Sequence, residues 1–243
     1  MSRPLAYCGF HHQARIALPA IGVNAQPVQL MLSGGLGLLW SEVEWPFVPD
    51  QMQRNALEFH EVVRHVFNQT AVIPFRLLSV FEDQQALKAF VAENEGRFLD
   101  DLERLKSFVQ MECVVYPAPR QAQGEAQAGS SSGKAYLEKK AAAMRSSEGF
   151  AQAVRDAVAH LCHEVRVREG KNGTRIFVLV ERGRETDFRQ AVSVLPLPEH
   201  LSRRISGPWP AAEFLSDPVK APQVADQKAA DQKTADQKIA GVQ

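Results

Sequence analysis

The sequence predicts an α+β protein with two domains and a disordered C-terminal tail. Strand-like and helix-like segments alternate over residues 5–116, a stretch rich in glycine, serine and alanine follows, and helices with a hairpin return after it. The predicted parts are a modified ferredoxin-like sandwich at 1–119, a flexible linker at 120–132, a smaller α+β domain at 133–216 and the tail at 217–243.

The first domain begins with strands. Residues 5–10 form a short apolar segment after a proline and are predicted to be a strand. Residues 28–40 place apolar segments on both sides of Gly34 and Gly35, which predicts a hairpin. The proline-rich residues 42–50 are predicted to be a loop that leads into the next helix.

Two amphipathic helices and two strands complete this domain. Apolar residues recur at spacings of three and four over 55–70 and 83–106, which is typical of helices that bury one face. Residues 71–81 are almost continuously apolar and are predicted to be a buried strand, and 108–116 to be another. Pro74 cannot donate a hydrogen bond to a neighbouring strand, so it indicates an edge, a bulge, or a strand that starts after it.

The second domain is also predicted to mix helices and strands. Asn172 and Gly173 lie between two apolar runs and are a specific signal for a hairpin turn. The other elements follow from the spacing of apolar residues. They are helices at 133–145, 148–165 and 185–194, hairpin strands at 165–168 and 175–181, and a last strand within 201–214.

The predicted tail carries a short repeat. The tetrad ADQK occurs three times at a five-residue period within 225–238. That period matches no helix, heptad or solenoid, and the repeats lack a large apolar residue that could anchor them. We therefore expect this tail to be disordered.

The composition excludes several classes of function. The 243 residues include 28 Lys plus Arg and 28 Asp plus Glu, so no global field favours nucleic acid or an anionic membrane. Cys8, Cys113 and Cys162 lie far apart in the sequence, which fits a reducing cytoplasm better than a disulfide framework. No segment has the character of a signal peptide or a membrane span. We expect a soluble intracellular protein.

No motif predicts catalysis, a cofactor or a metal. His60 and His65 invite comparison with the zinc protease motif HExxH, but a step of five residues places them about 140° apart around a helix, against about 40° for a step of four. His160, Cys162 and His163, on a predicted helix, do not converge on one ion either. We therefore expect neither an enzyme nor a bound cofactor.

Three separated motifs carry a resemblance to a known family. They are VIPFRLLSVF at 72–81, GKAYLEKK at 133–140 and GPWPAAEF at 207–214, accompanied by Tyr7-Cys8-Gly9 and His60-Glu61. In this order and at this spacing they resemble the GvpL/GvpF family of gas vesicle accessory proteins. The resemblance covers residues 5–215.

The resemblance implies a two-domain α+β fold and a role in building gas vesicles, the gas-filled protein shells that give cells buoyancy. We expect the protein to bind the small hydrophobic shell subunit during nucleation or growth of the shell. Other gas vesicle accessory proteins would be further partners, and the location would be the cytoplasm or the vesicle itself. An apolar groove or an open strand edge suits such a subunit. The candidate contact residues are Trp40, Trp45, Phe47, Pro74 and Arg76.

Two other classes of function stay open on the sequence alone. Ferredoxin-like domains often bind ligands between helix and sheet, so a non-catalytic small-molecule-binding or regulatory module is the alternative. A strongly shifted titratable group in a cleft would instead indicate an enzyme.

Overall fold

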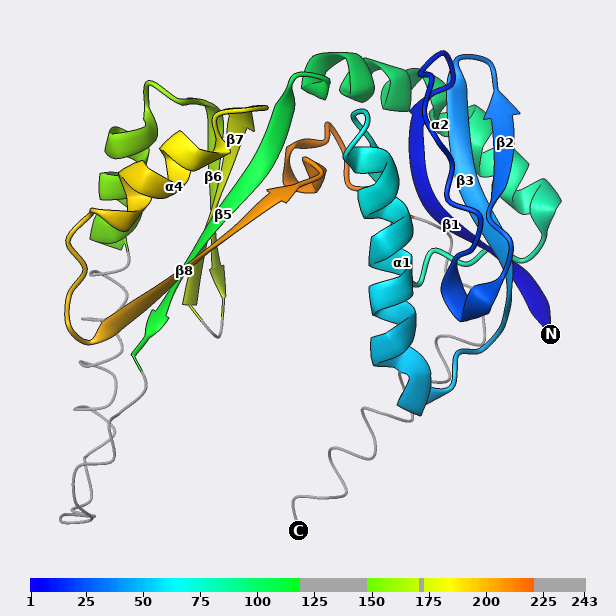
Figure 1. Cartoon of the computed structure of the whole chain (residues 1–243), viewed down its shortest axis with the longest axis horizontal. Helices are drawn as coiled ribbons and strands as arrows, with labels where there is room; N and C mark the ends of the chain where they lie inside the picture. Colours follow the sequence, from blue (N-terminus) through cyan, green and yellow to red (C-terminus); the bar gives the residue numbers. More distant parts are fainter. Residues whose placement is uncertain (119–147, 171–172, 221–243) are drawn as a thin grey trace, which may run out of the picture. The chain divides into compact units, whose positions relative to one another are not determined.

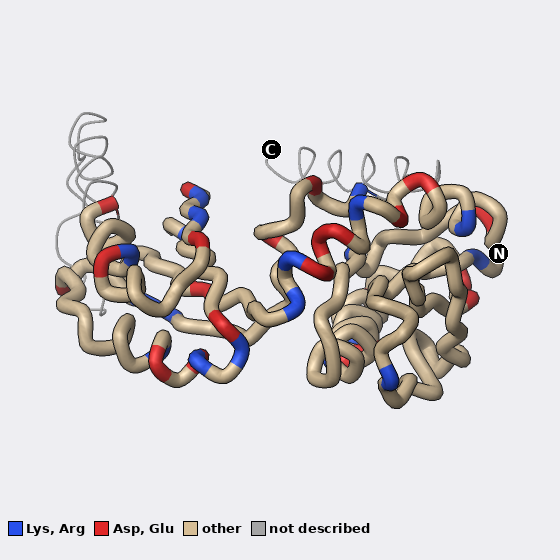
Figure 2. The backbone as a smooth tube through the Cα atoms, turned by 90° about the horizontal axis from the view of Figure 1, so that it is seen from above, with Lys and Arg blue, Asp and Glu red and all other residues tan. Residues whose placement is uncertain are grey.

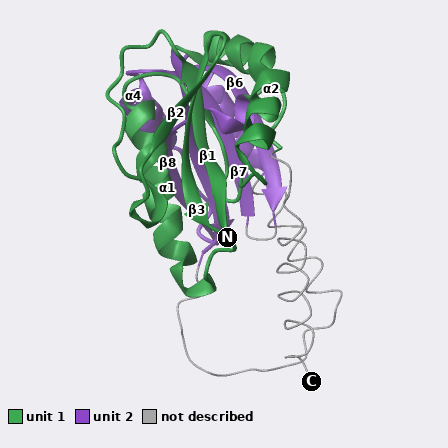
Figure 3. Ribbon diagram, turned by 90° about the vertical axis from the view of Figure 1, so that its right-hand side faces the viewer, with its two compact units in different colours: residues 1–106, 215–243 green, residues 107–214 purple. Residues whose placement is uncertain are grey.

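The computed structural model describes residues 1–118, 148–170 and 173–220 (Figure 1). The chain falls into two compact units (Figure 3). One comprises Met1–Lys106 together with the segment from Leu215 onward, and the other comprises Ser107–Phe214. Each unit contains an antiparallel sheet and helices. The predicted α+β class is therefore confirmed.

The sheet of the first unit has the strand order β2-β3-β1-β4, and every neighbouring pair is antiparallel. Between β2 and β3 lies the predicted hairpin turn, where Gly34 adopts a φ of +48°, a conformation that glycine reaches most readily. The strands are β1 (Ser2–His11), β2 (Gln29–Ser33), β3 (Leu36–Glu44) and β4 (Ile73–Pro74).

Helices α1 (Met52–Phe67) and α2 (Gln84–Leu105) cover opposite faces of this sheet (Figure 3). Both confirm helices predicted from the apolar spacing, with ends displaced by three residues or fewer. Tyr7 of β1 packs on Phe59 of α1, with ring centroids 5.2 Å apart. Asp83 caps the start of α2 by accepting a backbone hydrogen bond with its side chain.

The prediction of one continuous strand over 71–81 is wrong. Only Ile73–Pro74 is a strand, and Val80 makes an isolated bridge to β1. Between them the chain turns, because Ser79 donates its N–H to the Arg76 carbonyl at 2.8 Å and accepts the Arg76 N–H on its hydroxyl at 3.1 Å. Phe75 is buried in this turn as it would be in a strand, whereas Leu78 is exposed. A run of apolar residues does not by itself distinguish the two, so the hydrophobic pattern predicted the wrong one. The short β4 is an edge strand, as its proline indicated.

The sheet of the second unit has the strand order β6-β7-β5-β8 and is also antiparallel. Its strands are β5 (Phe108–Pro117), β6 (Cys162–Gly170), β7 (Gly173–Glu181) and β8 (Leu201–Trp209). The helical residues 148–158 and α4 (Glu185–Ser193) pack on one face. The core between them includes Met111, Cys113, Val154, Val158, Ile176, Val178, Phe188 and Val192.

The second unit has the chain order of a ferredoxin-like sandwich: strand, helix, two strands, helix, strand. The first sheet has an equivalent strand order with two modifications. Residues 12–28, whose only helical part is the 3₁₀ turn Val23–Ala25, take the place of the first helix. Helix α2 is added after β4.

The structure divides the chain at a different place from the sequence. The sequence ends the first domain at residue 119, whereas β5 pairs with β7 and β8 and belongs to the second unit. The predicted linker at 120–132 and the predicted helix at 133–145 lie outside the described residues. The helix predicted over 148–165 ends at 158.

Two further boundaries also differ. Cys162 begins β6, whose valines at 165 and 167 favour an extended strand over a helix. The last strand ends at Trp209, and Ala212–Phe214 form a 3₁₀ turn rather than a continuation of it. His160 and Cys162 therefore lie in a turn and a strand, not on the predicted helix.

Residues 215–220, which we call the C-terminal segment, belong to the first unit. Leu215 and Val219 are buried, and Ser216 is hydrogen-bonded to Asp101 of α2. The Arg97 side chain donates to the carbonyl oxygen of residue 217 at 3.2 Å. The predicted tail begins within this segment, and its residues 221–243 lie outside the described part of the chain.

Candidate functional site

The five contact residues predicted from the sequence do not form one surface. Trp40, Trp45 and Phe47 are buried in the first unit. The rings at 45 and 47 meet edge to face, with centroids 5.1 Å apart. Pro74 is half-buried on β4, and Arg76 is exposed in the turn that follows it. The three aromatic rings thus contribute to the core, and only the last two positions reach the surface.

Strand β2 offers an open edge on the other side of the same sheet. It pairs only with β3, so in the described structure its second row of backbone groups has no strand partner. Leu30 and Leu32 on this strand have exposed fractions of 42% and 61%. An edge strand with exposed apolar side chains is a template for another strand.

The two leucines face the same side as α1 does. Leu30 pairs with Leu39 in the sheet register, and Ser41 follows two positions later on the same face. The Ser41 hydroxyl donates to the Pro27 carbonyl at 2.8 Å, which places the loop at 12–28 on this face as well. The loop and the exposed leucines therefore belong to one side of the sheet.

Tyr7 holds the loop at Val23. Its hydroxyl accepts the Val23 N–H at 2.9 Å. Burial raises the pKa of the Tyr7 phenol, so the ring stays neutral under the loop. The Asn24 N–H donates to Glu58 of α1 at 2.8 Å.

Ala17 is the second attachment point. Its N–H donates to the Gln69 side-chain oxygen at 2.8 Å, and its carbonyl accepts from the Gln69 amide at 3.0 Å. The His65 Nε2 also lies 3.0 Å from that carbonyl. Between the two attachment points the loop exposes Leu18 and Ile21. We call Leu18, Ile21, Leu30 and Leu32 together the β2 surface.

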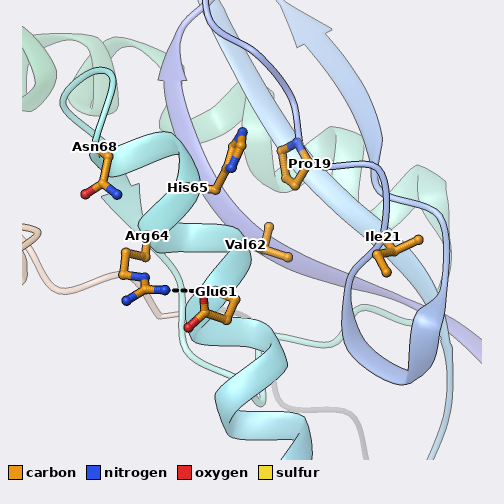
Figure 4. Close-up of a pocket in the computed structure, with 7 residues that line it drawn as sticks. All are labelled: Pro19, Ile21, Glu61, Val62, Arg64, His65 and Asn68. Carbon is orange, nitrogen blue, oxygen red and sulfur yellow. Dashed lines mark hydrogen bonds and ion pairs between the residues drawn. The ribbon is translucent and has the colours of Figure 1, made fainter.

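A shallow groove of about 240 Å³ lies between this loop and α1 (Figure 4). Val62 and His65 of α1 point toward the loop residues Pro19 and Ile21. Glu61, Arg64 and Asn68 complete the lining. The groove is smaller than the roughly 300 Å³ at which small-molecule sites usually begin, and much of its lining is polar.

A larger groove of about 380 Å³ lies along α2 beside the C-terminal segment. Its lining is mostly charged or polar, whereas ligand sites are usually lined by apolar side chains. The lining residues are Glu93, Asn94, Arg97, Asp217, Pro218 and Lys220.

The titratable groups give no support for catalysis. Burial raises the pKa of the Cys8 thiol to about 12 and that of Cys113 to about 11, the opposite of what an activated nucleophile needs. No group of three or more His, Cys, Asp or Glu side chains in the described residues could hold a metal ion. Of the described helices, none has both the length and the apolarity for crossing a membrane.

Sequence reasoning located the hairpin but missed the β2 surface. The signal was present: Leu30, Met31 and Leu32 are three consecutive apolar residues, and successive side chains of a strand point to opposite faces. Met31 is buried on the face of the sheet that α2 covers, so the side chains of Leu30 and Leu32 point to the other face. Their exposure depends on β2 being an edge strand, which the sequence does not specify.

Comparisons with known proteins agree on one family. The family model described as "Gas vesicle synthesis protein GvpL/GvpF" matches residues 5–216. A similar curated protein is gas vesicle protein L of Streptomyces sp. (strain CB03234), which is 27% identical, with 80% of this chain and 85% of the relative covered.

Two solved structures share the fold. The crystal structure of the gas vesicle protein GvpF from Anabaena sp. PCC7120 covers 92% of this chain and 100% of that chain, with a TM-score of 0.69 and 14% identity. The crystal structure of GvpF from Microcystis aeruginosa covers 88% of this chain and 99% of that chain, with a TM-score of 0.66 and 14% identity.

Proposed function

This chain belongs to the GvpL/GvpF family of gas vesicle synthesis proteins, and from that premise we propose that it binds the small hydrophobic shell subunit while the shell nucleates or grows. The family match over residues 5–216 carries the role in gas vesicle assembly. The proposal adds the partner and the surface. The protein acts in the cytoplasm beside other gas vesicle proteins and can remain as a minor component of the shell.

The β2 surface is the binding surface in this proposal. A shell subunit that exposes an apolar face or an open strand edge aggregates unless that surface is covered. Strand β2 supplies unpaired backbone groups for strand addition, and Leu30 and Leu32 supply apolar contact beside them. Leu18 and Ile21 extend the apolar area onto the loop.

The opposite edge is less suited to this role. Strand β4 has two residues, and Pro74 lacks the N–H that a partner strand would need. Arg76 is exposed but sits in the turn after the strand. Contact through Trp40, Trp45 or Phe47 would require these rings to leave the core. The proposal therefore moves from the five predicted residues to β2.

The experiment is co-expression of the full-length chain with the shell subunit, with the fraction of shell subunit that stays soluble as the readout. The test variant carries Leu30→Lys and Leu32→Lys, which keep the backbone edge but place two charges on it. The control variant carries Leu57→Lys and Val194→Lys, two exposed apolar positions elsewhere with the same change of charge.

The wild type and the control variant should raise the soluble fraction of the shell subunit, and the β2 variant should not. Thermal unfolding of the three proteins excludes a folding defect. Equal activity of the two variants would show that β2 is not the contact surface. If even the wild type leaves the shell subunit insoluble, the binding proposal fails, although the family assignment stands.

A further inference from the structure

Within residues 1–118, 148–170 and 173–220, no helix packs on one face of the second sheet. Residues 148–158 and α4 pack on the face that carries Met111, Cys113 and Val178. The other face carries the side chains in between, since successive residues of a strand point to opposite sides. Ala212–Phe214 cover part of this helix-free face, where the Arg166 guanidinium lies 5.2 Å from the ring centroid of the last of them.

Three arginines form one row across this face. Arg168 of β6 pairs with Arg175 of β7, which pairs with Val114 of β5, which pairs with Arg204 of β8. Lys, Arg, Asp and Glu are otherwise interspersed along the backbone of both units (Figure 2). We call Arg168, Arg175 and Arg204 the arginine row.

Side-chain contacts confirm which face the row occupies. Glu112, two residues before Val114, accepts from the Arg175 guanidinium at 2.5 Å and from the Ser206 hydroxyl at 3.2 Å. Because Ser206 lies two residues after Arg204 on β8, both point to this same face. The Arg175 guanidinium also lies over the Phe177 ring, 5.2 Å from its centroid.

The row has more positive charge than its neighbours balance. Arg175 is paired with Glu112, and Arg168 lies 2.6 Å from a Glu213 carboxylate oxygen. Arg204 is exposed and makes no ion pair with another described residue. The side chains of Arg168 and Arg175 are 64% and 54% exposed. A guanidinium has five N–H donors, so each paired arginine can donate hydrogen bonds to a further carboxylate.

The surface fits carboxylates better than nucleic acid. Sheets of this topology bind single-stranded RNA by stacking bases on exposed aromatic rings of the central strands. Here Phe177 and Leu179 on the central strand β7 are buried, and the Glu112 carboxylate lies in the middle of the face. A phosphate backbone would meet that negative charge, and β7 exposes no ring on which bases could stack, although Tyr116 of β5 on the same face is half-buried.

We propose that the arginine row is a docking surface for an acidic segment of a protein partner. Neighbouring strands lie about 4.8 Å apart, so Arg168 and Arg204, three strands apart, are separated by about 14 Å. Carboxylates four residues apart in an extended peptide are separated by about 13 Å. A segment with acidic residues on alternate positions therefore matches the row. This surface is in the second unit and is independent of the β2 surface.

The test measures binding of the full-length chain to fluorescent octaglutamate at low ionic strength. The test variant carries Arg168→Glu and Arg204→Glu, and the control carries Arg155→Glu and Arg184→Glu. The control positions, on the 148–158 helix and at the start of α4, change the net charge equally. Arg175 is left unchanged, because its loss would leave the buried Glu112 unpaired.

Octaglutamate should bind the wild type and the control alike, within about twofold, and the test variant at least about tenfold more weakly. The neutral variant Arg168→Gln, Arg204→Gln should have an affinity between those of the wild type and the test variant. This neutral variant replaces the test variant if the two glutamates prevent folding. Equal loss in the control would reduce the effect to net charge and overturn the proposal. So would an oligonucleotide of equal charge that binds while octaglutamate does not.

Discussion

The Ser216 N–H lies 3.1 Å from each carboxylate oxygen of Asp101, and the Ser216 hydroxyl donates to Oδ2 at 2.9 Å. Arg104 donates to Oδ1 of the same carboxylate at 2.6 Å. Asp101 is 2% exposed. A carboxylate buried this deeply is stable because donors surround it, and these donors attach the C-terminal segment to α2.

Replacement of this carboxylate should loosen the C-terminal segment. Asp101→Ala leaves the Ser216 N–H and hydroxyl without their acceptor, at a cost of about 1–3 kcal/mol in the free energy of unfolding. Urea denaturation measures that loss, and hydrogen exchange at residues 215–219 shows where it arises. The control is Asp100→Ala, an exposed neighbour that should change stability by less than about 0.5 kcal/mol. Equal effects of the two variants would contradict the role assigned to Asp101.

Stability should fall at alkaline pH because two thiols are buried. The folded-state pKa values of Cys8, about 12, and Cys113, about 11, exceed the ordinary value of 9.0. As the pH rises above 9, the unfolded chain therefore loses these protons first, and each pH unit costs about 1.4 kcal/mol per fully titrating thiol.

Urea unfolding between pH 8 and 11 measures this slope. The variant with Cys8→Ala and Cys113→Ala should start from a lower stability near neutral pH but lose less of it as the pH rises. Cys162→Ala, at a half-buried thiol, is the comparison and should keep most of the wild-type slope. Identical slopes for the double variant and the wild type would rule out the buried thiols as the cause.

Arg203 should stabilise the second unit through the end of α4. Its guanidinium donates to the carbonyl of Leu195 at 2.6 Å and to that of Ser193, and it lies over the Phe150 ring. Ser193 is the last residue of α4 and Leu195 lies just beyond it, where backbone acceptors lack intrahelical partners. Arg203→Ala should cost about 1–3 kcal/mol in unfolding free energy. Arg204→Ala, at the exposed neighbour, should cost less than about 0.5 kcal/mol in unfolding free energy. A larger loss from Arg204→Ala than from Arg203→Ala would contradict the stabilising role given to Arg203.

Gln69 should control how firmly the loop at 12–28 is held. Gln69→Ala removes both of its hydrogen bonds to Ala17 but leaves the contact of His65 with the same carbonyl. Amide exchange at Ala17 should become about fivefold faster, because one net hydrogen bond is worth about 1 kcal/mol. Gln13→Ala, an exposed change in the same loop, is the control. An unchanged exchange rate at Ala17 would mean that the loop is held elsewhere.

Local patterns predicted most of the helices and strands correctly. The helices at Met52–Phe67 and Gln84–Leu105 followed from apolar spacing, and the hairpin around Gly34 from its turn residues. These features depend on neighbours within a few positions. The prediction for 71–81 failed because a run of apolar residues does not distinguish a strand from a turn that buries only some of them.

Long-range partners were beyond local patterns. The sequence prediction assigned β5 to the first domain, whereas the structure places it in the second unit. The partner strands β7 and β8 begin only at residues 173 and 201, and no motif on β5 indicates that it pairs with them. Asp101 and Ser216 are 115 positions apart and gave no signal. No local pattern around Trp40 separates a core ring from a contact ring, and the structure buries it. The β2 surface likewise depends on strand order, which decides that Leu32 lies at an edge.

The measurement that tests the central claim most directly is site-specific photocrosslinking in cells that make the shell subunit. A photoreactive amino acid replaces Leu32 on the exposed edge of β2 in one variant and Val194, exposed in the second unit, in the other. The account predicts a covalent product with the shell subunit from position 32 and none from position 194. A product of equal yield from both positions, or no product from position 32 while the shell subunit is present, would contradict it.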